Sequence, residues 1–95
     1  MILHKVARSP FDSTALQRCL RRISDQDAIL LLQDAVYAAF SDNEVTEALR
    51  ALPQVYLLKD DVDARGITNR LYNAKLVGYP EFVQLCAQYN KVISW

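Results

Sequence analysis

The stretch that decides the fold is AILLLQDAVYAAF, residues 28–40. Its first five residues, Ala28–Leu32, are all apolar and lack the alternation of a strand with one wet face. Such a run predicts a strand that is covered on both faces, as in parallel sheets. Gln33 and Asp34 break the run, and an alanine-rich segment of helical character follows. We therefore expect Asp34 and Tyr37 just beyond the carboxyl end of a central strand, where open α/β sheets collect their sites.

Strands and helices alternate on both sides of this stretch. Further strands are predicted at residues 2–7, 54–58 and 75–78, the last of them near an edge, and residues 91–95 supply a small fifth strand if they pair. A strand, a helix and a second strand in that order predict a right-handed crossover. We therefore expect one domain over residues 1–95, an α/β fold with an open, mostly parallel sheet of four or five strands flanked by helices.

Capping residues predict where the helices begin. Ser9-Pro10 favours a helix start, because serine accepts from free amides and proline fits the first turn. Ser41 stands three residues before Glu44, the spacing of a capping box. A short helical turn is predicted before Gly66, and the last helix opens at Pro80. If the first helix starts later than Ser9, then Asp12 or Ser13 takes the capping role.

Composition narrows the class of function. The chain has 95 residues, of which 52% are hydrophobic, and its eleven basic residues balance eleven acidic ones. The apolar excess favours a surface that a partner covers. The balanced charge argues against direct contact with nucleic acid or an anionic membrane. We expect a cytoplasmic protein without signal peptide or membrane span, whose two cysteines are free thiols.

Residues needed for nucleotide or metal chemistry are scarce. The only glycines are Gly66 and Gly78, so a glycine-rich loop that cradles phosphate is hard to build. His4 is the only histidine, which argues against a multi-histidine metal site and favours a structural residue at the start of a strand. No metal or other cofactor is expected.

The two cysteines occupy different positions on their predicted helices. Cys86 lies in the middle of an apolar face, which predicts a buried, protonated thiol. Cys19 lies at the margin of the face formed with Leu16 and Leu20, and Arg22 lies about 60° round the helix from it. A marginal thiol beside an arginine is better placed to be exposed and partly ionised. On the pattern alone, a plain core role for Cys19 stays slightly ahead.

Charged residues at other positions allow two interpretations each. Asp34, Asp60 and Asp61 form either a carboxylate cluster where two strands end or a set of turn and cap residues, and the turn and cap preferences favour the second. Three arginines of the first helix form either a solvated face or a partner surface: Arg18, Arg21 and Arg22.

Several motifs resemble those of one known family in their order and spacing. They are Leu3-His4, Ser9-Pro10-Phe11, LLLQDAVYAA at 30–39, LLKDDVDARGI at 57–67, YPEFVQL at 79–85 and the terminal Trp95. Together they resemble the TusB/DsrH family along nearly the whole chain. One difference is Ala35, where members often have glycine, which suggests a turn without positive φ.

The resemblance implies a small domain of the DsrE-like kind that works inside a complex. It implies a dimer of heterotrimers with TusC-like and TusD-like subunits, which accepts persulfide sulfur from a TusA-like donor and passes it to a TusE-like acceptor. The product is 2-thiouridine at the tRNA wobble position. The chief persulfide cysteine belongs to the TusD-like subunit, so this chain is expected to be a component of a sulfurtransferase complex that is not catalytic by itself.

Two other functions remain open at this point. DsrH-type subunits of dissimilatory sulfur oxidation carry a cysteine in the first helix, and Cys19 is similar in placement, so it is a candidate persulfide carrier. A small-ligand binding module at the strand ends, around the motif residues Asp34, Asp60 and Arg65, is the second alternative. Four aromatic residues are candidate partner anchors or, equally, core residues: Tyr37, Tyr56, Tyr72 and Trp95.

Overall fold

The computed structural model describes all 95 residues and contains one five-stranded sheet. Its strands are β1 (Ile2–Val6), β2 (Ala28–Leu31), β3 (Val55–Leu58), β4 (Ala74–Val77) and β5 (Lys91–Ser94). They lie in the order β4-β3-β2-β1-β5, and every neighbouring pair is parallel. The predicted α/β class and open sheet are therefore confirmed, with the higher of the two strand numbers and with β4 at an edge.

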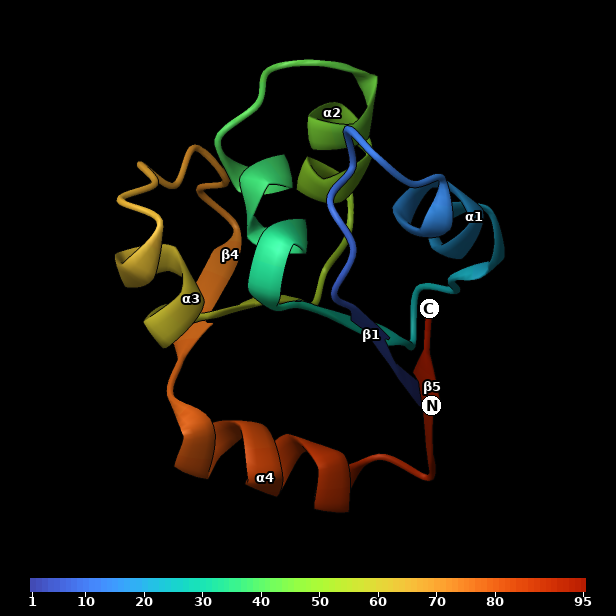
Figure 1. Ribbon diagram of the computed structural model, residues 1–95. Coiled ribbons are helices and arrows are strands. Elements are labelled where there is room, and N and C mark those ends of the chain that lie inside the picture. Colours follow the sequence, from blue (N-terminus) through green and yellow to red (C-terminus); the bar gives the residue numbers. More distant parts are fainter.

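Helices cover the two faces of the sheet unequally (Figure 1). Four helical segments lie on one face: α1 (Ala15–Arg22), the 3₁₀ helix η1 (Gln33–Ala39), α2 (Glu44–Arg50) and α3 (Lys59–Ala64). Only α4 (Tyr79–Gln88) lies on the other face. We call these the four-helix face and the α4 face. No helix is both long and apolar enough to cross a membrane.

Strand β2 is central and is buried along its whole length. Its side chains alternate between the two faces of the sheet, so that Ile29 and Leu31 join one core while Ala28 and Leu30 join the other. The apolar run lacks alternation because both faces of β2 are covered, as the sequence predicts.

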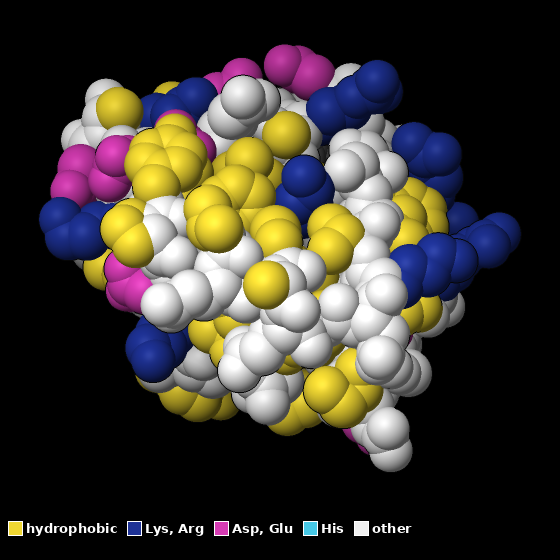
Figure 2. All heavy atoms as spheres, turned by 90° about the horizontal axis from the view of Figure 1, so that it is seen from below, with side chains coloured by type: hydrophobic (Ala, Val, Ile, Leu, Met, Phe, Trp, Pro, Cys, Tyr) yellow, Lys and Arg dark blue, Asp and Glu magenta, His cyan; other side chains and the backbone are white.

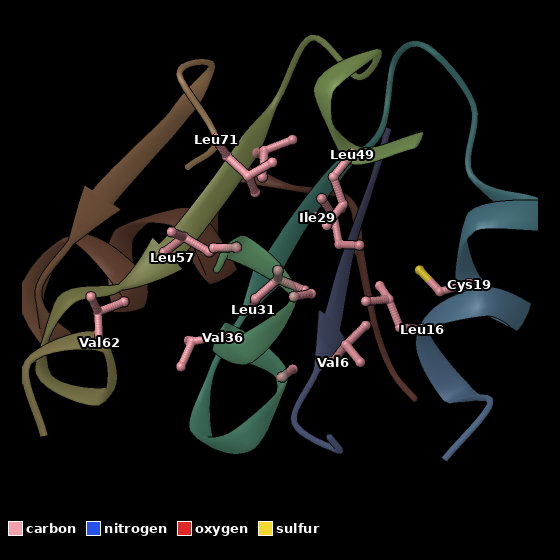
Figure 3. Packing of buried hydrophobic residues seen from close by; sticks show 14 of the residues in the cluster. Val6, Leu16, Cys19, Ile29, Leu31, Val36, Leu49, Leu57, Val62 and Leu71 are labelled. Carbon is pink, nitrogen blue, oxygen red and sulfur yellow. The ribbon is translucent and has the colours of Figure 1, made fainter. Parts of the chain in front are cut away.

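The two cores differ in size. The core under the four-helix face contains 15 buried residues, including Leu16, Leu31 and Leu57 (Figure 3). The core under α4 contains 5 buried residues, and among the residues of α4 only Leu85 is buried. The domain therefore depends mainly on the four-helix face for its apolar burial.

The helix starts at Ser9 and Ser41 are wrong, whereas the later start of the first helix near Ser13, which the sequence left open, agrees with the structure. Helix α1 begins at Ala15, whose amide donates to Ser13 Oγ over 3.1 Å, whereas the Ser9 hydroxyl serves a local turn by accepting from the Phe11 amide. Helix α2 is capped by Asn43 rather than Ser41, whose hydroxyl instead donates to the carbonyl of Tyr37. Ser9 and Ser41 bond to backbone groups outside the two helices, an alternative to capping that short hydroxyl side chains often take.

Candidate functional site

Arg65 joins two segments at the carboxyl end of the sheet. It is the residue directly after α3, and its Nε and Nη2 donate to Asp34 Oδ1 over 3.0 and 2.9 Å. Its Nη1 lies 3.5 Å from Asp61 Oδ1, one helical turn earlier. Asp61 Oδ2 in turn accepts from the backbone amide of Gln33 over 2.7 Å. The exits of β2 and β3 are thus held together by one guanidinium and two carboxylates.

This network holds an unusual backbone conformation. Gln33 has φ +49°, in the left-handed region that residues with a side chain seldom adopt. The prediction from Ala35 that this turn has no positive φ is therefore wrong, since the left-handed residue lies two positions earlier. The bond from Gln33 N to Asp61 compensates for the strain, which typically costs about 1 kcal/mol or more.

Asp61, not Asp60, belongs to this network. Asp60 is exposed, and its carboxylate makes none of the hydrogen bonds of the cluster. The signal was present in the sequence, because Asp61 and Arg65 are four residues apart and share one helix face. Asp34 and Tyr37 lie at the strand end as expected, beside a shallow hollow of about 440 Å³ that Phe11 also lines. Because Arg65 already binds Asp34, the cluster ties two strand exits together and leaves little free charge for a ligand.

The structure favours the core interpretation of Cys19, and it contradicts the predicted burial of Cys86. Cys19 is 0% exposed and faces the sheet within the larger core (Figure 3). Its burial, with a smaller contribution from the negative charge of Asp27, raises the pKa of the Cys19 thiol to about 12. Cys86, predicted to be buried, is half-buried because α4 packs loosely on its face. Cys19 is therefore placed as a core residue, without the ionised thiol that sulfur chemistry requires.

A buried polar chain links the two ends of the sequence. Asp27 Oδ2 lies 3.0 Å from His4 Nε2, and Trp95 Nε1 donates to His4 Nδ1 over 3.0 Å. Since the indole N–H can only donate, His4 Nδ1 must accept, so the proton of the neutral ring sits on Nε2 and points to Asp27. The sequence identified His4 as a structural residue, but it gave no sign that Trp95, 91 positions away, would be a hydrogen-bond partner of His4.

Asp27 is held in its charged form by this arrangement. Burial acts to raise the pKa of Asp27, but hydrogen bonds from His4 and from the backbone amides of Ser24 and Ile2 outweigh it, and the pKa of Asp27 lies below its ordinary value. The Asp27 carboxylate therefore fixes the tautomer of His4, and His4 in turn fixes the position of the Trp95 indole.

The four aromatic candidates fall into three environments. Tyr72 is 83% exposed, and it lies outside both cores. Tyr37 and Tyr56 are half-buried, and the Tyr56 hydroxyl donates to Gln54 Oε1. Trp95 is half-buried and held by His4. The structure does not bring these residues together on one surface.

The α4 face exposes apolar side chains instead. Tyr79 and Val83 of α4 are 52% and 64% exposed, and Val92 of β5 is 36% exposed. Around them, Tyr56, Phe82, Cys86 and Tyr89 pack only partly against the small core. Figure 2 shows this face, with hydrophobic side chains spread across it and few charges at its centre. No group of three or more His, Cys, Asp or Glu side chains is placed to hold a metal ion.

This protein belongs to the class of small α/β domains with a parallel sheet, and two solved structures share its fold. The crystal structure of the ychN protein of Escherichia coli matches with a TM-score of 0.83 over 99% of this chain and 97% of that chain, at 21% sequence identity. The solution structure of protein Tm0979 of Thermotoga maritima matches with a TM-score of 0.65 over 92% of each chain, at 28% identity.

Sequence comparison then gives the family. The family model described as "DsrH like protein" matches residues 8–92. Protein TusB of Escherichia coli O1:K1 is 40% identical over 99% of this chain and 100% of its own length, and Protein TusB of Shigella flexneri is 38% identical over the same shares. The chain belongs to the TusB/DsrH family of sulfur-relay subunits, which confirms the resemblance seen in its motifs.

Proposed function

We propose that this chain is a non-catalytic subunit of a heterohexameric sulfurtransferase complex of the cytoplasm. In this proposal it assembles with TusC-like and TusD-like subunits into a dimer of heterotrimers. The complex takes persulfide sulfur from a TusA-like donor and passes it to a TusE-like acceptor, for 2-thiolation of the tRNA wobble uridine. The similarity to Protein TusB over the whole chain supports this pathway over its alternatives.

The incomplete α4 face is the observation that carries the proposal. One helix of ten residues does not cover one face of five strands, so Val92 of β5 stays exposed, and α4 itself presents Tyr79 and Val83 to water. Apolar side chains gathered on one surface favour association, because a partner that covers them removes their area from water. A sister subunit of similar fold would complete the smaller core in the way that four helices complete the larger one.

The state of Cys19 supports a scaffolding role over a catalytic one. A persulfide carrier must present a thiolate to a partner's sulfur. With a pKa of about 12 and no exposed surface, Cys19 offers neither the charge nor the access. In this proposal the sulfur-carrying cysteine belongs to the TusD-like subunit, as the family resemblance implies.

The alternative, a DsrH-type subunit with Cys19 as carrier, makes a separate prediction. In it, α1 must move away from the sheet when a partner binds, to expose Cys19. The test is to supply the assembled complex with a persulfide donor and to locate bound sulfur by mass spectrometry. Sulfur on Cys19, together with loss of transfer in Cys19→Ser, would establish the alternative. Unchanged transfer in that variant would leave the scaffolding role.

The test of the proposed function is co-expression with TusC-like and TusD-like partners. We expect the three chains to co-purify as one hexamer, and the single chain to self-associate. Val83→Glu places a charge on the α4 face and should break the hexamer without unfolding the domain. Ala51→Glu adds the same charge at an exposed position after α2 and serves as the control. A single chain that stays monomeric and ignores both partners would contradict the proposal.

A further inference from the structure

Three arginines on the outer side of α1 surround a hollow. Arg18, Arg21 and Arg22 are exposed, and together with Trp95 they line a space of about 510 Å³. None of the three pairs with a carboxylate, in contrast to Arg65, which binds two. Figure 2 shows basic side chains gathered at the right-hand side, where α1 lies in Figure 1. Three unpaired guanidiniums thus face one small space.

The fourth wall of the hollow is rigid. The indole of Trp95 is held by His4 Nδ1 at 3.0 Å, and its backbone amide donates to the carbonyl of Lys5 over 2.9 Å. Because the indole N–H and the backbone amide of Trp95 are both hydrogen-bonded, the ring is already ordered before a ligand binds. A rigid aromatic wall lowers the entropy cost of binding.

Helix stability explains only part of this arrangement. Arg21 and Arg22 lie in the last turn of α1, where positive charge offsets the helix dipole. Arg18 lies one turn earlier, too far from the helix end to offset the dipole. The helix dipole also does not explain why Trp95 lines the same hollow. The charge is also local, because the chain as a whole has net charge zero.

We propose that this hollow binds an acidic segment of a partner protein. Carboxylate side chains of the segment would accept forked hydrogen bonds from the guanidiniums, and an apolar side chain beside them would pack on the indole of Trp95. The proposal rests on the proposed function only in naming the partner as a protein of the sulfur relay. A relay protein must dock and leave repeatedly, and charge complementarity speeds such encounters.

The size and setting of the hollow favour an acidic protein over RNA. A nucleic-acid surface spreads its basic residues along a track that follows the phosphates. Here the unpaired arginines occupy one side of one short helix, and the chain has no excess of positive charge beyond them. A few carboxylates match this patch better than a long polyanion does.

The binding test uses the full chain and a fluorescein-labelled peptide of eight glutamates and one leucine. We expect the peptide's anisotropy to rise on binding, and its affinity to fall about tenfold between low and physiological salt. Trp95 is the only tryptophan, so its emission should change in step with the anisotropy. Arg21→Gln combined with Arg22→Gln should weaken binding about tenfold or more.

The control removes the same amount of charge from the far end of the four-helix face. Lys59→Gln combined with Arg70→Gln changes two exposed cations and should leave the affinity unchanged. Absence of binding, or an equal loss in the control, would overturn the proposal. So would tighter binding of a uridine oligonucleotide of equal charge, which would assign the hollow to RNA. Co-purification with the partner subunits is measured separately, so failure of the proposed complex would be recognised on its own.

Discussion

On one face of the sheet, four helical segments enclose 15 buried residues, whereas on the other α4 alone encloses 5. Both faces belong to the same strands, and β2 sends alternate side chains to each. The difference therefore comes from the helices that follow the strands, and not from the sheet itself. It separates two tasks, since the four-helix face holds the domain together and the α4 face is the surface that a partner covers in the proposed complex.

The largest expected difference between the faces is in cysteine reactivity. A pKa of about 12 reduces the thiolate fraction of Cys19 about a thousandfold relative to an ordinary cysteine, and burial slows its reaction further. Half-buried Cys86 should therefore react with iodoacetamide at pH 8 while Cys19 stays unmodified, as followed by intact-mass spectrometry. Cys19 should react only when urea unfolds the chain. Comparable rates in the folded protein would show that the two faces are equally open.

Truncation of one leucine on each face should separate their energetic roles. Leu31→Ala, at 0% exposure in the larger core, should lower the free energy of unfolding by about 3–4 kcal/mol. Leu85→Ala should cost only about 2 kcal/mol, because Leu85 borders a hollow of about 280 Å³ between α4 and β4. Urea denaturation of the two variants measures this. Equal losses would mean that α4 is packed as well as the other helices.

Acidification should weaken the four-helix side through Asp27. Its pKa is lower in the folded protein than in the unfolded chain, so its contribution to stability is complete above the unfolded value and disappears as the pH falls through the folded value. Asp27→Asn should cost about 2 kcal/mol at neutral pH and should flatten the loss of stability below about pH 4. Thermal unfolding from pH 7 to 3 tests both. If Asp27→Asn loses stability between pH 7 and 3 as steeply as the unmodified protein does, other carboxylates are responsible for that loss.

The smallest effect is expected outside both cores. Tyr72 is 83% exposed, so Tyr72→Ala should change the free energy of unfolding of the isolated domain by less than about 0.5 kcal/mol. If Tyr72 is a partner anchor, Tyr72→Ala should instead weaken the complex, which co-purification with the partner subunits would show. A large loss of stability in the isolated domain would mean that Tyr72 supports the loop before β4.

Sequence periodicity was sufficient for the sheet but not for the site. The run at 28–32 predicts β2 correctly, because a strand that is buried on both faces needs apolar residues at every position. The burial of Cys19 agrees with the core role that the pattern slightly favoured, since a residue 60° from an arginine can still lie under the helix when α1 packs closely. The link between His4 and Trp95 depends on β5 pairing with β1, a contact that no local pattern encodes. The sequence offered both Asp60 and Asp61, and the predicted strand-end motif took Asp60 whereas the structure uses Asp61, because adjacent aspartates differ only in helical phase.

The pairing of β1 with β5 has a consequence for synthesis on the ribosome. β1 precedes the other four strands in the sequence, yet one of its two edges is filled only by β5, which follows all of them. During translation β1 and β2 can associate early, but the outer edge of β1 stays unpaired until β5 has left the ribosome. A stalled or prematurely terminated chain therefore displays a bare strand edge, the feature by which chaperones and proteases can distinguish unfinished copies from finished ones.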